Sequence, residues 1–237
     1  FNMKKYFLLL IITFITVSNA QNDLLLRFPS LNNNGSLITF SYQGDIWTVP
    51  STGGKATRLT IHEAYEAYPK FSPDGKQIAF SGNRYGNNDI FVLPTEGGTP
   101  KRLTYHSAQD NISSWTNDND ILFSTNREFN QIERPSEVYS ISSNGGTEFR
   151  ILDAVGFEPV ASPDGRFIAF VRGDINPVFR EEYRGPSNRD IWLFDTKTKT
   201  YSKLVNFETN DINPQWSDSR TLFFLSSNSG KYNWFWR

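Results

Sequence analysis

The sequence contains no cysteine and only two histidines, and both shortages limit its chemistry. Without cysteine there can be no disulfide, no thiol nucleophile, no cysteine zinc site and no lipid on a processed cysteine. Positive charge is not in excess either, because beyond residue 20 there are 22 basic and 25 acidic residues. No basic stripe with interleaved aromatic residues occurs, so we expect no nucleic-acid partner. The fold must be held together by packing.

Long apolar runs are lacking everywhere except near the N-terminus. There, two lysines precede an apolar run of 12 residues, 6–17, and the small residues of Ser18-Asn19-Ala20 follow. This run is shorter than the roughly 20 residues that span a bilayer as a helix. We therefore expect residues 1–20 to be a cleavable signal peptide rather than an uncleaved anchor. Residues 21–237 would then form the mature domain, with no membrane span.

Two short patterns recur along the mature chain. One is an apolar triplet ending in Phe, and the other is an acidic residue followed by a β-branched and an aromatic residue. The triplets end at Phe40, Phe80, Phe123, Phe170 and Phe224, and the acidic motifs begin at Asp45, Asp89, Glu137 and Asp190. From each acid to the next triplet Phe the spacing is 35, 34, 33 and 34 residues. Such regularity indicates a structural repeat.

Turn sequences separate the strands that these patterns predict. Ser-Pro-Asp-Gly precedes two triplets, at residues 72–75 and 162–165, and degenerate forms stand at 116–119 and 217–220. Proline presets the turn, and glycine adopts the left-handed conformation that leads into the next strand. Gly-Gly pairs at 53–54, 97–98 and 145–146 follow the acidic motif as hairpin turns, before Leu-Thr or a similar pair that we expect to mark a fourth strand.

Four short antiparallel strands in each module of roughly 40–50 residues are typical of a β-propeller blade. We therefore predict an all-β fold, a β-propeller of four-stranded antiparallel blades. We expect about four and a half blades, four of them between residues 32 and 206. Residues 24–28 would be a spare strand that completes the last blade of a closed ring. Each blade exposes apolar surface to both neighbours and is stable only when stacked.

The turns also sort into two faces. The uniform Ser-Pro-Asp-Gly and Gly-Gly turns share one face, and the loops of variable length share the other. Because loops on a rigid scaffold commonly carry binding, we expect a peptide or protein partner on the variable face, above all at Arg172–Arg189. That segment is equally well interpreted as an insertion that covers a sheet edge.

No catalytic, metal or cofactor site is predicted. His62 and His106 occupy the same place in successive repeats, which suggests a side chain bonding its own loop; no third zinc ligand accompanies them. No Gly-x-Ser-x-Gly motif occurs. Asp118-Asn119-Asp120 lacks the rest of a calcium loop and is interpreted as a turn. Glu181-Glu182 is interpreted as a solvated charge pair rather than an acid–base dyad.

The run from Pro69 to Phe80 resembles the repeat of TolB-like propellers. Residues 25–29, 44–50 and 183–192 resemble the N-terminal propeller of tricorn protease homologues. The resemblance implies a large serine peptidase that trims peptides, with the propeller as a gated passage or docking module. The catalytic serine and histidine would lie in a separate C-terminal protease domain, so no position here matches one.

The same resemblance implies six blades in the complete ring and a parent protein that can form a homo-oligomer. Combined with the signal peptide, it implies a periplasmic location. Two alternatives stay open. One is a stand-alone TolB-like periplasmic propeller that binds a protein and catalyses nothing, and the other is the propeller of a prolyl-oligopeptidase-type peptidase.

Overall fold

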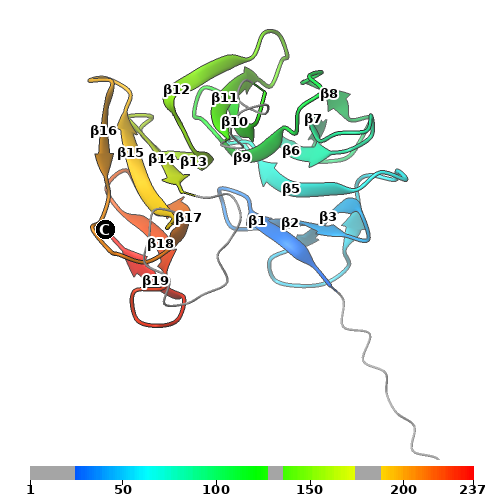
Figure 1. Cartoon of the computed structure of the whole chain (residues 1–237). Coiled ribbons are helices and arrows are strands. Elements are labelled where there is room, and N and C mark those ends of the chain that lie inside the picture. The colour runs from blue at the N-terminus through cyan, green and yellow to red at the C-terminus, as the bar shows by residue number, and fades with distance from the viewer. Residues whose placement is uncertain (1–24, 128–135, 174–187) are drawn as a thin grey trace, which may run out of the picture.

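The computed structural model describes residues 25–127, 136–173 and 188–237, and in them all regular secondary structure is β-strand. Successive antiparallel sheets, the blades, are arranged around a common centre (Figure 1). The first strand of each blade lies innermost and contacts the first strand of the next. The predicted all-β propeller of four-stranded blades is therefore confirmed. In the described residues no helix is long and apolar enough to span a membrane.

The blades follow the chain in order. Blade 1 contains β1 (Arg27–Leu31), β2 (Leu37–Tyr42), β3 (Asp45–Pro50) and β4 (Thr57–Arg58). Blade 2 contains β5 (Glu66–Phe71), β6 (Gln77–Gly82), β7 (Asp89–Pro94) and β8 (Lys101–Arg102). Blade 3 contains β9 (Asn111–Trp115), β10 (Asp120–Thr125), β11 (Glu137–Ser142) and β12 (Phe149–Val155). Blade 4 contains β13 (Phe157–Ala161), β14 (Phe167–Arg172), β15 (Asp190–Asp195) and β16 (Thr200–Lys203). Blade 5 contains β17 (Asp211–Trp216), β18 (Leu222–Ser226) and β19 (Asn233–Trp236).

Two expectations about the blades need correction. The structure has five blades, the last with three strands, rather than about four and a half. The predicted spare strand is not spare, because β1 is the first strand of blade 1 and pairs with β2 from Arg27↔Ser41 to Leu31↔Ile38. Because the recurring patterns start at the triplet of the second strand, they place this first strand in the wrong blade.

Three of the four fourth strands are also displaced from their predicted place, whereas β12 contains Ile151-Leu152 as predicted. β4 and β8 end just before the Leu-Thr pairs that were expected to form them. Instead, the Thr60 and Thr104 hydroxyls accept the backbone N–H groups of Ile46 and Ile90, each at 2.9 Å. These buried threonines therefore accept a backbone N–H group of the third strand and do not extend the fourth.

The repeated landmarks act as predicted in the remaining elements. Gly75 and Gly165 both have φ of 71°, the left-handed conformation that the turn requires. The hydroxyl of Ser72 donates to Asp74 at 2.6 Å, and this hydrogen bond is the main reason that the Asp74 pKa is lowered. The triplet phenylalanines of blades 2 to 5 are essentially inaccessible. They fill apolar clusters such as the one that blades 2 and 3 build together.

Ion pairs form a second repeat, which the sequence motifs do not reveal, and in all but Asp190–Lys203 the acid is buried. The acid that begins the third strand pairs with a cation 13 residues later on the fourth: Asp45 with Arg58, Asp89 with Arg102 at 2.8 Å, and Asp190 with Lys203 at 2.9 Å. A further acid stands at or just before the start of the first strand, and it pairs with an arginine that follows the second strand: Glu66 with Arg84, and Asp110 with Arg127 at 2.7 Å. Both kinds of pair lie where consecutive blades meet.

Candidate functional site: the axial cavity

The first strand of every blade carries a β-bulge. In the pairing of first with second strand, the register shifts once in each blade, at 27–30, 67–70, 112–114, 157–160 and 212–215. In four of the five bulges a residue with positive φ precedes a proline: Phe28, Tyr68, Glu158 and Asn213 have φ between 52° and 58°. The proline has no N–H to offer the ladder, so the extra residue is placed where pairing is already interrupted.

This backbone conformation is costly. Positive φ is uncommon outside glycine, is an outlier for bulky residues such as Phe28 and Tyr68, and costs about 1–3 kcal/mol per residue. Strained residues of this kind concentrate at ligand sites. Their recurrence at one position in successive blades therefore directs attention to the surface that they share.

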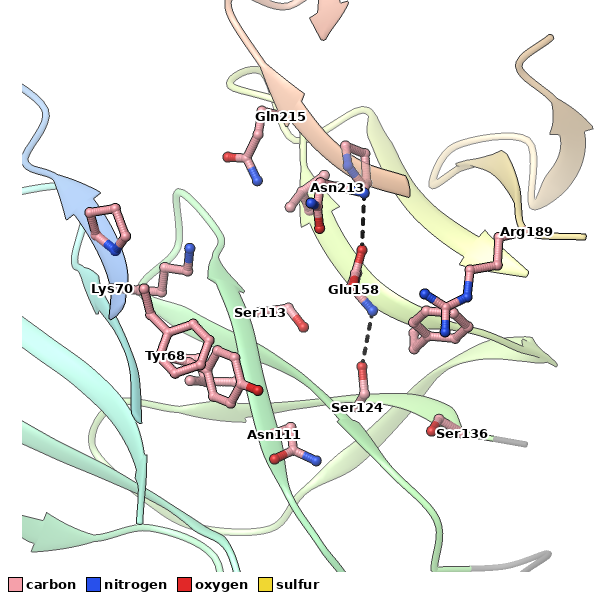
Figure 2. Close-up of a pocket in the computed structure, with 16 residues that line it drawn as sticks. Tyr68, Lys70, Asn111, Ser113, Ser124, Ser136, Glu158, Arg189, Asn213 and Gln215 are labelled. Carbon is pink, nitrogen blue, oxygen red and sulfur yellow. Dashed lines mark hydrogen bonds between the residues drawn. The ribbon is translucent and has the colours of Figure 1, made fainter. Parts of the chain in front are cut away.

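That surface is the wall of a cavity of about 670 Å³ on the propeller axis. The volume lies within the range of small-ligand sites, roughly 300–1,000 Å³. Its wall combines aromatic and aliphatic side chains with amides, hydroxyls and charges, and all five blades contribute to it. Figure 2 labels its polar residues, which come from blades 2 to 5. The aromatic part includes Phe28 and Tyr68, whose ring centroids lie 4.0 Å apart.

Hydrogen bonds between blades fix the wall. The Ser81 hydroxyl of blade 2 accepts the N–H of Ile112 at 2.8 Å, and the Ser124 hydroxyl of blade 3 accepts the N–H of Glu158 at 3.2 Å. Glu158 of blade 4 in turn accepts the N–H of Asn213 at 3.1 Å through Oε2, as drawn in Figure 2. Blades 2, 3 and 4 thus each satisfy a backbone donor at the bulge of the next blade.

Three charged side chains line the cavity. Burial lowers the pKa of Lys70, and Glu158 partly opposes this shift. Burial raises the pKa of Glu158, against the effects of the Asn213 N–H, Arg189 and Lys70. The Arg189 guanidinium lies 5.2 Å from the centre of the Phe157 ring. Because both signs of charge are present in a partly desolvated space, the cavity can bind a polar ligand through several contacts.

The described lining residues do not include a serine with a histidine base beside it. Ser113, Ser124 and Ser136 line the cavity, but no histidine accompanies them among its described lining residues. A serine nucleophile needs a base within hydrogen-bond reach. The described hydroxyls can donate and accept hydrogen bonds to a ligand.

The residues considered from sequence lie elsewhere. His62 and His106 each accept, through Nδ1, the backbone N–H two residues later, at 2.9 and 3.0 Å. They bond their own loops, as the repeat suggested. Residues 118–120 belong to the turn from β9 into β10, where Asn119 has φ of 61°. Glu181-Glu182 and most of Arg172–Arg189 lie outside the described residues. Arg189, the last residue of that segment, does line the cavity.

The bulges were missed although the sequence contains a signal for them. A proline stands three residues before the turn that leads to the second strand at Pro29, Pro69, Pro159 and Pro214. An isolated x-Pro pair predicts only an extended or turn conformation. The four x-Pro pairs indicate a shared bulge only because they occupy the same place on the first strands, which all face the axis.

Comparison with known proteins gives the family. Residues 23–237 match the model of the tricorn protease N-terminal beta propeller domain. The tricorn protease homologue of Saccharolobus solfataricus is 26% identical over 204 residues, covering 84% of this chain and 18% of that protein. The chain thus spans less than a fifth of the length of this relative.

Solved structures show the same fold. The crystal structure of the tricorn protease superposes with a TM-score of 0.75 at 19% identity, covering 90% of this chain and 21% of that one. TolB from Acinetobacter baumannii superposes with a TM-score of 0.61 at 18% identity, covering 89% of this chain and 54% of that one. The match of the family model, which covers all of the described residues, shows that the chain belongs to the tricorn protease N-terminal β-propeller family.

Proposed function

We propose that this chain is a non-catalytic peptide-docking module of a periplasmic tricorn-like serine peptidase, and that peptides bind in the axial cavity. The observation that carries the proposal is the set of bulges. Their strained backbone conformations place Phe28, Tyr68, Glu158 and Asn213 on one wall. Family membership supports a role beside a peptidase. Cleavage itself would belong to a separate protease domain.

An extended peptide suits the chemistry of this wall. Amide and hydroxyl groups of Ser113, Asn213 and Gln215 can bond peptide N–H and C=O groups, while the Phe28–Tyr68 pair can pack against an apolar side chain. Lys70 and Glu158 offer one charge of each sign. This mixture favours a peptide backbone over a purely apolar or purely anionic ligand.

Replacing both Phe28 and Tyr68 with asparagine tests this proposal. Asparagine tolerates positive φ, so the change removes the aromatic surface while keeping the bulge conformation accessible. We expect peptide affinity, measured by fluorescence anisotropy with a labelled library of short peptides, to fall about tenfold or more.

The matched control is Tyr105→Asn, which changes an exposed tyrosine in the link between β8 and β9. This variant should bind as the unaltered chain does. Loss of affinity in the control with none in the double variant would place recognition on the variable loop face and contradict the axial proposal. Binding of a folded protein but of no peptide would favour the TolB-like alternative.

A further inference from the structure

The joint between blades 4 and 5 differs from the earlier joints in its charge balance. A joint here means the contact between the acid that begins the third strand of one blade and the residue at or just before the first strand of the next blade whose N–H bonds the carbonyl preceding that acid. In the joint of blades 2 and 3, Asp89 and Asp110 are matched by Arg102 and Arg127. In the joint of blades 4 and 5, Asp190 pairs with Lys203, but Asp211 has no ion-pair partner among the described residues.

Backbone hydrogen bonds show that these positions are equivalent. The N–H groups of Glu66, Asp110 and Asp211 each donate to the carbonyl of the residue just before the preceding blade's acid, at 2.9, 2.8 and 2.7 Å. Gly156 makes the same bond at 2.7 Å. It carries no acid because a Cβ there would collide with the Phe170 ring, so the joint of blades 3 and 4 needs one cation fewer.

The missing cation can be traced to one residue. Arg84 follows Asn83, whose N–H donates to the carbonyl of Tyr65 at 3.2 Å. In blade 5 the equivalent bond runs from Ser227 to Asn210 at 3.1 Å, so Asn228 stands where blade 2 has its arginine. Arg127 has the same offset from Phe123 that Asn228 has from Phe224. Asn228 thus leaves the acid of blade 5 without its usual partner.

Asp211 is therefore a buried carboxyl group whose negative charge no paired cation among the described residues neutralises. It is 0% exposed, and neither carboxylate oxygen has a hydrogen bond of normal geometry within the described residues. Burial raises its pKa to about 6; the nearby Ser226 hydroxyl lowers it, Asp190 raises it further, and Lys203 offsets part of the shift. Burial is the main cause of the raised pKa of Tyr232; Arg189 lowers that pKa, and the charge of Asp211 raises it further.

The other charged groups on the neighbouring strands are engaged elsewhere. On β13, the Glu158 carboxylate bonds the N–H of Asn213. On β14, the Arg172 guanidinium lies 4.9 Å from the centre of the Trp192 ring. Lys203 on β16 is already shared with Asp190. No described arginine occupies the position that would neutralise Asp211.

We propose that the joint of blades 4 and 5 is a proton-sensitive latch: uptake of a proton by Asp211 holds β17 against blade 4, and loss of that proton loosens it. Asp211 lies two residues before Asn213, which donates to Glu158 in the cavity wall. Loosening β17 therefore opens the wall between these blades. The latch itself rests on the joint alone, whereas its effect on peptides rests on the proposed function.

The direction of the pH dependence follows from the pKa of the Asp211 carboxyl group in the closed and the open joint. When the joint opens, Asp211 returns to its ordinary pKa of 3.8, which is lower than its value of about 6 in the closed joint. The closed joint therefore has its full stability below pH 4 and loses it as the pH rises through about 6. A shift of about two pKa units corresponds to a change of about a hundredfold in the opening equilibrium.

Amide hydrogen exchange of β17 tests the latch, with rates corrected for the intrinsic effect of pH and with β6 of blade 2 as internal reference. We expect protection of Asp211–Trp216 to fall up to about a hundredfold between pH 4.5 and pH 8, well beyond any change in β6. Asp211→Asn should keep β17 protected at pH 8. Asn228→Arg should do the same by supplying the missing cation, and Asn228→Gln is its matched control.

The proposal is overturned if hydrogen-exchange protection depends on pH equally in β17 and β6. It is also overturned if the pH dependence of β17 protection is unchanged in both Asp211→Asn and Asn228→Arg. Recovery of protection at pH 8 on adding calcium would overturn it too, because a metal ion rather than a proton would then be the neutralising group. Peptide binding measured on the same samples separates the two claims. A chain that binds no peptide contradicts the proposed function, while the exchange result still decides the latch.

Discussion

Replacing Arg127 with alanine is expected to lower the free energy of unfolding by about 3–5 kcal/mol, the usual cost of leaving a buried charge without its partner. Arg127 contacts Asp110 at 2.7 Å, and Asp110 is completely buried. Burial already raises the pKa of Asp110, and Arg127 is one of the groups that lower it. The guanidinium also lies 5.4 and 5.0 Å from the ring centres of Phe123 and Tyr139, so packing is lost as well. Urea denaturation measures the change.

The control for this variant is Arg166→Ala. Arg166 pairs with Asp195 at 3.1 Å, but its side chain is 49% exposed, so we expect a loss below about 1 kcal/mol. Adding Asp110→Asn to Arg127→Ala should recover part of the stability, because the uncompensated charge is removed. Equal small losses in the two single variants would show that the buried pairs do not contribute to the joints as inferred.

The second large effect is expected from Phe123→Ala. Phe123 ends a repeated triplet, is 0% exposed, and packs in the cluster that joins blades 2 and 3. Truncating a buried phenylalanine leaves a cavity and costs about 3–5 kcal/mol. Because the cluster spans two blades, the change should destabilise both rather than one.

Phe149→Ala is the matched control, since Phe149 belongs to the same blade and is 64% exposed. Its unfolding free energy should stay within about 0.5 kcal/mol of the unaltered chain. Similar losses in the two variants, measured by urea denaturation, would contradict the assignment of the triplet phenylalanines to the core between blades.

The regular part of the fold could be predicted because each landmark solves a local problem. Asp74-Gly75 makes a turn wherever it occurs, and an alternating triplet such as 78–80 buries one face of a strand. The first strands were harder to assign. Their pattern is interrupted by the bulge, so β1 shows neither clean alternation nor a turn signature, and its place in blade 1 depends on pairing with β2.

The cavity could not be predicted because it depends on distances between blades. Lys70 and Glu158 lie 88 positions apart in the chain and meet only when blades 2 and 4 face one axis. The ion pairs between third and fourth strands could be predicted in part. Their spacing of 13 residues is visible in the sequence, but an acid and a base at that distance have no local reason to pair. A four-stranded meander supplies that reason by placing the third and fourth strands side by side.

The most direct test of the account is to find where a bound peptide touches the chain, using a peptide that carries a benzophenone group and mapping the adducts by mass spectrometry after illumination. Binding on the axis predicts adducts on the innermost strands, at Phe28, Tyr68, Ile112 and Phe157, from blades that are far apart in sequence. Adducts confined to the loops between second and third strands, such as residues 83–88, would show that peptides bind to the outer loops and that the cavity is not their site.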